Sequence, residues 1–513
     1  MRRGLLPLGI AISLLGLGAC GTGEGRSAAD VVAAIETNPV SLDPRVATDA
    51  LSLHVAGLLF NGLVRADDHL RVVPDLARRW EQPDDRTVIF HLREGVRFHR
   101  GRELTADDVR FTFESLQTIG SAHTPLLQEV KEIRVLDRYR VAFHLKRPFT
   151  PLLYHLTVGI VPADLASQAG FGQAPVGTGP FRFTRWGQNE EVELEAFPGY
   201  FGGSPRITRL RLRIIPDATI RFLELKKGNI DLLLGSLPPE VLSLVDSLPG
   251  VQTATGPSSN YTYLGFNLRD PILADRKVRR AIAYALDRKG LIAHLLRGQA
   301  TAATGLLFPQ HWAYEPQVAT FPFDPERARR LLDEAGYPVT QEGVRFALTF
   351  KATTGELSRA IAEAIQFQLA QVGIRLEIRS YEWGTFYADI KSGNFQLYVL
   401  TWVGITDPDY YQYIFHSDSL PPLGANRGYY RNPEVDRLLL HGRRTADTGG
   451  RKTTYGRIQQ ILAEELPYIS LWHELRWVAY KARIRGFSLM PGGDFTPLKD
   501  VWIDDRERMT DDR

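Results

Sequence analysis

Two short runs in this sequence hold residue types that can do chemistry, and both also fit a structural role. Residues 176–180 (Val-Gly-Thr-Gly-Pro) are glycine-rich like a phosphate-binding loop, but they lack its lysine and end on proline, which favours a tight turn. Residues 407–409 (Asp-Pro-Asp) offer two carboxylates for acid–base chemistry. An Asp as N-cap, a Pro at the first helical position and an acid in the first turn also start a helix, and we expect this role.

Signatures of common enzyme classes are missing from the sequence. It has no His-Glu-x-x-His zinc site, Walker loop or Gly-x-Ser-x-Gly elbow, and its 12 histidines are scattered. Carboxylates are as abundant as on any soluble surface, so a catalytic pair of acids stays open. Nothing in these residues recommends catalysis, so we expect no catalytic residue, no metal and no cofactor, and we keep an extracytoplasmic hydrolase as an alternative function.

The single cysteine, Cys20, is where the sequence predicts a covalent modification. A basic start, an apolar stretch and small residues precede it, which predicts a secretory signal peptide at residues 1–19. The stretch is too short for a membrane span, which needs about 20 apolar residues. Residues 17–20 (Leu-Gly-Ala-Cys) are similar to the lipobox of bacterial lipoproteins. This likeness implies that Cys20 carries lipid.

Residues 20–30 contain Gly21, Gly23 and Gly25 and little that could pack, so they predict a flexible tether behind the lipid. We expect the protein in the periplasm or on the outer face of the cell envelope, lipid-anchored to a membrane. A chain of 513 residues predicts two or three domains. The formal charge of +3, without any basic block, argues against a nucleic-acid partner.

The pattern of apolar residues predicts an α/β protein. In the C-terminal half, strands are expected at 345–351, 374–378 and 395–402, with helices at 357–372 and 386–391 between them. This alternation is typical of a sheet covered by helices. The remaining expected elements are a helix at 275–287, strands at 87–92, 192–194 and 206–214, and a hairpin over 135–145. Thr105 and Asp108 have the spacing of a capping box at a helix start.

Short segments that follow one another along nearly the whole chain point to a family. They are residues 36–44, 74–80, 87–98, 104–109, 175–181, 228–231, 263–286, 323–337 and 383–409, with Pro-Asp-Leu-Ala at 74–77 and Gly-Thr-Gly-Pro at 177–180. Together they resemble the bacterial extracellular solute-binding family 5, the peptide- and nickel-type receptors of ABC transporters. Each motif alone is weak, but their order is very specific.

The resemblance implies a two-lobed periplasmic-binding-protein-like fold of type II, whose lobes close on a ligand about a hinge. The implied parts are a lobe I core (31–46, 177–265 and 477–505), an inserted subdomain (47–176) and a lobe II (266–476). The implied function is a monomeric receptor of an ABC importer, which captures a peptide or peptide-like solute and delivers it to a membrane permease. A ligand-presenting sensor or chaperone on the same fold is a further alternative.

The resemblance also implies which residues meet the ligand. They are Asn38, Pro39 and Val40 on the first lobe, Asn260 and Tyr261 near the hinge, and Trp383, Thr401 and Trp402 on the second lobe. Aromatic residues suit a cleft because they offer flat apolar area with few rotamers to freeze. The alternative for both tryptophans is a place in the core.

The sequence departs from the peptide receptors of this family at two positions. Their Asp that pairs with a peptide amino group is replaced by Ile405, and the Arg three residues before the cleft Trp is replaced by Val399. A buried ammonium without its carboxylate costs several kcal/mol, so a free peptide should bind poorly unless Asp409 or Glu382 substitutes. We expect a preference for an uncharged, blocked or otherwise modified ligand.

Overall fold

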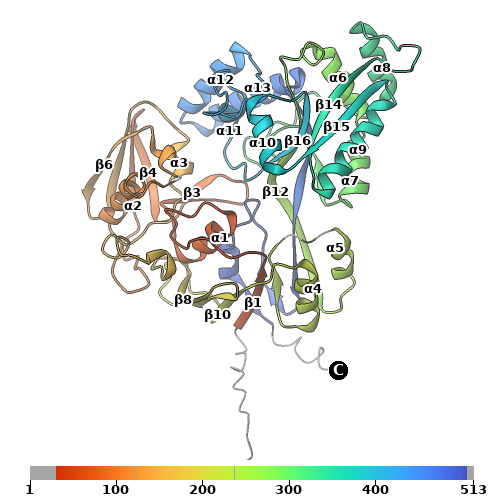
Figure 1. The fold of residues 1–513 in the computed structure, drawn as a ribbon. Helices are drawn as coiled ribbons and strands as arrows, with labels where there is room; N and C mark the ends of the chain where they lie inside the picture. The colour runs from red at the N-terminus through yellow and green to blue at the C-terminus, as the bar shows by residue number, and fades with distance from the viewer. Residues whose placement is uncertain (1–29, 122, 236, 238, 505–513) are drawn as a thin grey trace, which may run out of the picture.

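The computed structural model describes residues 30–504 except 122, 236 and 238. The predicted signal peptide, Cys20 and the predicted tether up to residue 29 lie outside the described residues. The molecule has two lobes, which Figure 1 shows one above the other. The long strands β12 (Val251–Phe266) and β17 (Tyr468–Lys481) join them. The predicted two-lobed α/β fold is confirmed.

One sheet runs through both lobes. Over the described residues its order is β15-β14-β16-β12-β17-β11-β1-β10-β9-β8, with β13 beside β17. Its other strands are β1 (Asp30–Ile35), β8 (Phe181–Gly187), β9 (Glu191–Ala196), β10 (Arg209–Ile214) and β11 (Leu232–Leu233) in the lower lobe, and β13 (Ala300–Ala302), β14 (Phe346–Thr353), β15 (Ile374–Tyr381) and β16 (Leu397–Trp402) in the upper lobe. Val31 and Val32 in β1 pack into different apolar clusters, because successive side chains of a strand point to opposite faces.

A second, four-stranded sheet forms the outer part of the lower lobe. Its order is β4 (Ala77–Asp84), β5 (Thr87–Leu92), β7 (Arg140–Leu145) and β6 (Val130–Asp137), with α2 (Ala106–Thr118) and α3 (Leu152–His155) nearby. We call this part the side subdomain. The predicted hairpin is β6–β7. The predicted capping box is also present, since Asp108 accepts a hydrogen bond from the Thr105 backbone N–H at 2.9 Å.

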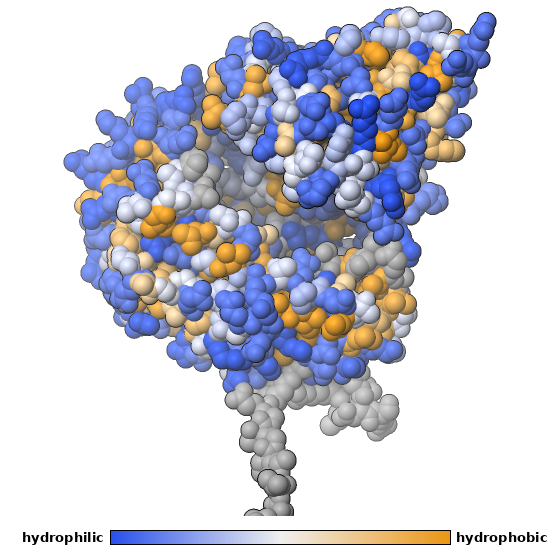
Figure 2. All heavy atoms as spheres, viewed as in Figure 1, coloured by the Kyte–Doolittle hydropathy of each residue, from blue (hydrophilic) through white to orange (hydrophobic). Residues whose placement is uncertain are grey.

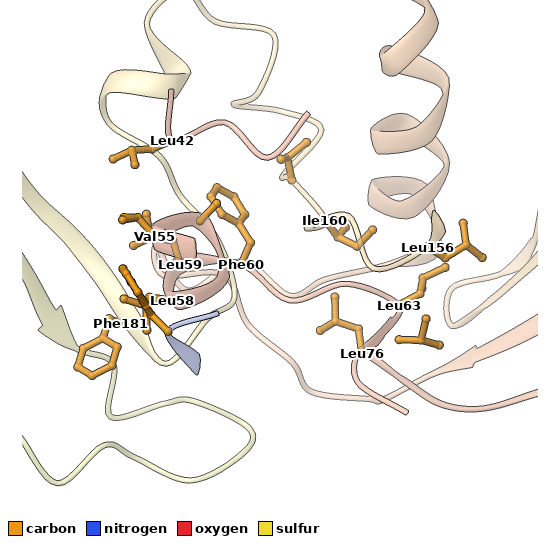
Figure 3. Packing of buried hydrophobic residues seen from close by; sticks show 14 of the residues in the cluster. Leu42, Val55, Leu58, Leu59, Phe60, Leu63, Leu76, Leu156, Ile160 and Phe181 are labelled. Atoms are coloured by element: carbon orange, nitrogen blue, oxygen red, sulfur yellow. The ribbon is translucent and has the colours of Figure 1, made fainter. Parts of the chain in front are cut away.

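The side subdomain shares one apolar core with the rest of the lower lobe. Phe90 and Phe113 of the side subdomain belong to the same cluster as Phe181 of β8. Figure 3 shows the part of this cluster around α1 (Ala50–Leu59). The other lower-lobe elements are α4 (Ala218–Lys227), α5 (Pro239–Val245), β2 (Val64–Ala66), β3 (Val72–Pro74), β18 (Ile484–Arg485), β19 (Trp502–Ile503) and the 3-10 helices at Thr124–Leu127, Phe171–Gln173 and Thr496–Asp500.

Helices cover both faces of the upper-lobe sheet. One face packs against α6 (Arg276–Ala285), α7 (Arg288–Leu295), α8 (Pro325–Glu334) and α9 (Glu356–Ala370), and the other against α10 (Trp383–Ser392), α11 (Tyr410–Phe415), α12 (Pro433–Arg444) and α13 (Thr448–Glu465). The predicted strand–helix unit β14-α9-β15-α10-β16 is confirmed, with β14 parallel to β15 and β16. The helix expected over 275–287 ends at Ala285, because Asp287 instead caps α7 by accepting from the Gly290 N–H at 2.9 Å.

The lobes meet where the ladder between β12 and β17 is interrupted. Residues 251–257 of β12 pair with β17 in the lower lobe, and the regular register is lost between Pro257 and Tyr261. From Tyr261 onward, β12 pairs with both β17 and β16 in the upper lobe. Residues 258–260 therefore lie at the crossing from one lobe to the other.

Candidate functional site: the cavity between the lobes

A cavity of about 1030 Å³ lies between the lobes. Figure 2 shows the hollow that separates the upper lobe from the lower lobe. Its lining comes from α1 and the loop after it, the β2–β3 region, α3 of the side subdomain, the loop after β9, the segment after β16 and the C-terminal segment. The residues named below from this lining are Asn61, Asp75, Tyr154, His155, Tyr200, Asp407, Asp409 and Tyr413. Aromatic faces and carboxyl groups thus share one space between the lobes, as in binding sites for small polar molecules.

A second contact joins the lobes away from the hinge strands. The Thr150 N–H donates to the Arg443 carbonyl at 2.8 Å, and its hydroxyl donates to the Thr445 carbonyl at 3.0 Å. The Trp312 N–H donates to the carbonyl of His69 at 3.2 Å. We call these hydrogen bonds the clasp. Because the hinge and the clasp both bridge the lobes, the cavity has protein on several sides.

Asp75 is the buried acid that the lower lobe contributes to the cavity. Both of its carboxylate oxygens accept from Asn61 Nδ2, each at 3.1 Å, and Asn61 Nδ2 also lies 3.2 Å from the Tyr200 hydroxyl. Burial raises the pKa of Asp75 from 3.8 to about 6, although the hydrogen bond from Asn61 works in the opposite direction. Asp75 is therefore partly protonated near neutral pH.

The upper lobe contributes Asp407 and Asp409. Asp407 is buried and forms an ion pair with Arg451 of α13, with 3.1 Å between Oδ1 and Nη2. Asp409 lies 2.9 Å from Nε of Arg443, and burial raises its pKa to about 6. These acids face the cavity while both are held by arginines of neighbouring helices.

The structure corrects the expected role of residues 407–409 in part. The helix begins at Tyr410 rather than at Pro408, and Asp409 is its N-cap residue without a capping hydrogen bond from its side chain. Asp407 accepts from the Asp409 N–H at 2.7 Å, so it stabilises the turn before the helix. The α-helix begins later because the N–H groups of Tyr410 and Tyr411 donate to carbonyls only three residues back, those of Asp407 and Pro408, at 3.2 and 3.0 Å, which is turn pairing rather than α-helical pairing.

Four of the residues expected at the ligand lie together beside the hinge. In the pairing of β12 with β16, Tyr261 is opposite Trp402, and Thr262 is opposite Thr401. The hydroxyls of Thr262 and Thr401 are 2.7 Å apart. Asn260 is held at the crossing, since its Nδ2 donates to Glu474 at 2.8 Å and its Oδ1 accepts from the Gly404 N–H at 3.2 Å.

Tyr261 and Trp402 differ in how far they are buried. Tyr261 is 2% exposed and its hydroxyl is 2.7 Å from that of Ser470, so its side chain belongs to the upper-lobe core. Trp402 is half-buried, and its ring centroid lies 6.2 Å from that of Tyr413, which lines the cavity. Trp402 is therefore next to the cavity rather than in the middle of the core.

The other expected residues stand further from this group. Trp383, at the first turn of α10, is 54% exposed and stacks on Tyr387 with 5.4 Å between ring centroids. Asn38, Pro39 and Val40 follow β1 in the lower lobe, where Asn38 exchanges hydrogen bonds with Asn189. None of the eight expected residues is among those lining the cavity in the described structure.

Arg427 is a residue of this region that the sequence did not single out. It is 7% exposed, its two Nη atoms donate to the hydroxyls of Tyr263 and Tyr387 at 3.1 Å each, and its guanidinium lies 4.6 Å from the Trp402 ring centroid. Its neighbours come from β12, α10 and β16, so only the folded chain reveals that this arginine is buried. An arginine in a loop otherwise suggests a solvated surface residue.

The two departures from the family pattern are also placed by the structure. Ile405 is 1% exposed, and its N–H donates to the Ser259 carbonyl at 3.0 Å. Val399 lies in β16 opposite Leu264. Glu382, which could have replaced the missing acid, instead caps α10 by accepting from the Gly384 N–H at 2.7 Å. Of the two acids considered as substitutes, Asp409 alone lines the cavity.

Neither a metal centre nor a membrane-crossing helix is found in the part of the chain that the structure describes. Within residues 30–504, apart from the three omitted positions, no group of His, Asp or Glu side chains could hold a metal ion. Among the helices of the same residues, none is long and apolar enough to cross a membrane.

Comparison with known proteins relates this chain to a protein family. The model of the bacterial extracellular solute-binding proteins, family 5 (middle region), matches residues 71–420. The oligopeptide-binding protein AppA of Bacillus subtilis is 28% identical over 94% of this chain and 93% of its own length. The glutathione-binding protein GsiB of Shigella boydii is 30% identical over 96% of this chain and 98% of its own.

Solved structures agree with this match. HbpA2 of Haemophilus parasuis superimposes with a TM-score of 0.84 at 27% identity, over 93% of this chain and all of its own. AppA of B. subtilis in complex with a nonapeptide superimposes with a TM-score of 0.70 at 27% identity, over 93% of this chain and 99% of its own. The unliganded open form of the murein tripeptide binding protein MppA superimposes with a TM-score of 0.81 at 21% identity, over 92% of this chain and 97% of its own. This chain belongs to the bacterial extracellular solute-binding proteins, family 5.

Proposed function

We propose that this protein is the receptor of an ABC importer, which captures a peptide or peptide-like solute between its lobes and delivers it to a membrane permease. The observation that carries the proposal is the cavity of about 1030 Å³ bounded by both lobes. A space of this size accommodates a ligand as large as a short peptide. Relatives named for oligopeptide and glutathione binding support the same ligand class.

Capture by lobe closure is part of the proposal. The match to the unliganded open form of MppA has a higher TM-score than the match to AppA with a nonapeptide, 0.81 against 0.70, although AppA has the higher sequence identity. This difference supports an arrangement of the lobes that differs from that of the nonapeptide complex, although the clasp already joins the lobes away from the hinge. A ligand that contacts both lobes favours the closed state by the contacts that only this state provides.

The proposal includes the parts inferred from the sequence. Residues 31–46, 177–265 and 477–505 would form the lobe I core, 47–176 the inserted subdomain and 266–476 lobe II. Ligand contacts are assigned to Asn38, Pro39, Val40, Asn260, Tyr261, Trp383, Thr401 and Trp402, which supplement the cavity lining on closure. The receptor acts as a monomer that is held at the outer face of a membrane by lipid on Cys20.

The ligand is proposed to lack a free amino terminus at the cleft tryptophan. Ile405 is buried where an acid would be needed, and Glu382 is engaged as a helix cap. Asp409 already lies beside Arg443, so a ligand ammonium would compete with that arginine. An N-blocked or otherwise modified peptide avoids the cost of a buried ammonium without a partner.

A hydrolase is the second candidate function. Asp75 and Asp409, with pKa values raised to about 6 by burial, favour testing it, because general acids work best with a pKa near the working pH. Each acid is already held, by Asn61 and by Arg443 respectively. These contacts account for both side chains structurally.

Native mass spectrometry of the purified protein separates the two functions. A receptor retains a small solute, and denaturing chromatography releases that solute with its mass unchanged after prolonged incubation. Cleavage products that accumulate with time would instead establish the hydrolase. Added C-blocked and N-blocked peptides, incubated in the same way, provide the reference for unchanged mass.

A further inference from the structure

Arg427 is a buried cation that has no carboxylate partner. The side chain is 7% exposed, and two of its N–H groups donate to the hydroxyls of Tyr263 and Tyr387. Among the described residues no Asp or Glu forms an ion pair with it. Phenol hydroxyls are neutral, so they satisfy hydrogen bonds without balancing the charge. Burial of a guanidinium without a partner of opposite charge is unfavourable.

Aromatic rings surround the guanidinium and connect it to the residues expected at the ligand. It lies 4.6 Å from the ring centroid of Trp402 and 5.3 Å from that of Tyr387, which stacks on Trp383. Such cation–π contacts orient the rings. Trp383, Tyr387, Arg427 and Trp402 therefore form one connected wall, which we call the tryptophan wall.

A second donor without a partner lies in the same wall. Nε1 of Trp402 is buried and has no hydrogen-bond partner among the described residues. The ring of Trp402 is next to Tyr413, a lining residue of the cavity between the lobes. Most buried donors in folded proteins have a partner, and the other buried donors without one among the described residues include Nε1 of Trp186. An anionic acceptor would satisfy both an indole N–H that has no hydrogen-bond partner and a neighbouring guanidinium whose charge no described carboxylate balances.

We infer that the tryptophan wall binds an anionic group of the ligand, a carboxylate, through Arg427 and the indole N–H of Trp402. This inference rests on the proposed receptor function and names the charge of its ligand. The position where the family pattern has an arginine holds Val399, and no other cation touches Trp402 in the described residues. The ligand is then an acid whose amino end is blocked or absent.

Charge-matched ligand libraries test the inference. Two libraries of N-acetylated tripeptides with identical sequences are used, one ending in a carboxylate and the other in a carboxamide. The purified full chain is equilibrated with both, and affinity selection with mass spectrometry measures the ratio of retained acid to retained amide. We expect the acid to be favoured at least about tenfold, because hydrogen bonds to charged groups are the stronger ones.

Variants separate recognition from folding. Arg427→Met should abolish the preference for acids, while Arg431→Met, the same charge loss at an exposed position four residues away, should keep it. Arg427→Lys keeps the charge without the planar fork and should keep a reduced preference. Trp402→Phe keeps an aromatic ring but removes the indole N–H, and it should also reduce the preference for acids. Thermal melting shows whether each variant is folded. If Arg427→Met does not fold, Arg427→Lys and Trp402→Phe carry the test.

The outcomes are distinct for the two proposals. Equal retention of acids and amides by the unmodified protein, or a preference that persists in Arg427→Lys and Trp402→Phe without any reduction, overturns the anion site and leaves the receptor function standing. Retention of neither library overturns the anion site together with the proposed class of blocked peptide ligands. Acid retention that is lost with Arg427→Met and kept with Arg431→Met supports the site.

Discussion

Replacing Asp75 by Asn should make the protein more stable at neutral pH. The Asp75 side chain is buried beside the cavity, and burial raises its pKa from 3.8 to about 6. The folded protein therefore binds the proton of this acid more tightly than the unfolded chain does. The stability that this proton provides is present at acidic pH and is lost as the pH rises from about 4 through 6.

The size of the effect follows from the pKa shift. A rise of the Asp75 pKa from 3.8 to about 6 corresponds to about 3 kcal/mol of unfolding free energy at a pH above both values. Asn has nearly the same shape and cannot ionise, and its amide oxygen can accept the hydrogen bond from Asn61. We expect Asp75→Asn to raise the free energy of unfolding by about 2–3 kcal/mol at pH 7.5 and to have little effect at pH 4.

Thermal and urea unfolding from pH 4 to 8 measure this difference. Asp68→Asn is the matched control, because the side chain of Asp68 is 70% exposed and its replacement should change stability little at any pH. A loss of stability with Asp75→Asn at pH 7.5 would refute the reasoning. So would a gain of the same size at pH 4 and pH 7.5, since the gain would then not depend on ionisation.

Three further predictions concern the ligand, the fold and the anchor. Trp402→Ala should weaken ligand binding by about 1–3 kcal/mol in calorimetry, through loss of an aromatic contact, and unchanged affinity would show that Trp402 does not contact the ligand. Gly177→Ala should destabilise the lower lobe by roughly 3 kcal/mol in urea unfolding, because a Cβ would collide with the Leu59 carbonyl of the backbone. Gly57→Ala in α1 is its control and should be neutral or slightly stabilising, as its nearest neighbour is 3.7 Å away. Cys20→Ala should abolish labelling by a fatty-acid probe without unfolding the protein, and persistent labelling would contradict the lipobox prediction.

The regular elements of this fold could be predicted from the sequence because their signals are local. The alternation of Phe346, Leu348 and Phe350 and the helical spacing of Ile361 and Ile365 set β14 and α9 without knowledge of the rest of the chain. The capping box at Thr105 is likewise contained within a few residues. These elements were predicted correctly.

The site could be predicted only in part, because distant residues build it. Asn61 and Asp75 meet through loops of the lower lobe, and Asp407 meets Arg451 from a helix 44 positions further along the chain. No local pattern marks these pairs. The burial of Arg427 arises from three separate elements of the upper lobe. The grouping of Asn260, Tyr261, Thr401 and Trp402 was implied by the family resemblance, and pairing of β12 with β16 places these residues together.

Small-angle X-ray scattering with and without bound ligand tests the central claim most directly, namely that a solute is captured by closure of the two lobes. The ligand is the solute identified by native mass spectrometry, added in excess to protein that has been freed of it. The account predicts that the radius of gyration decreases on binding and that the solute is recovered unchanged. A radius of gyration that stays the same at saturating ligand would contradict capture by closure.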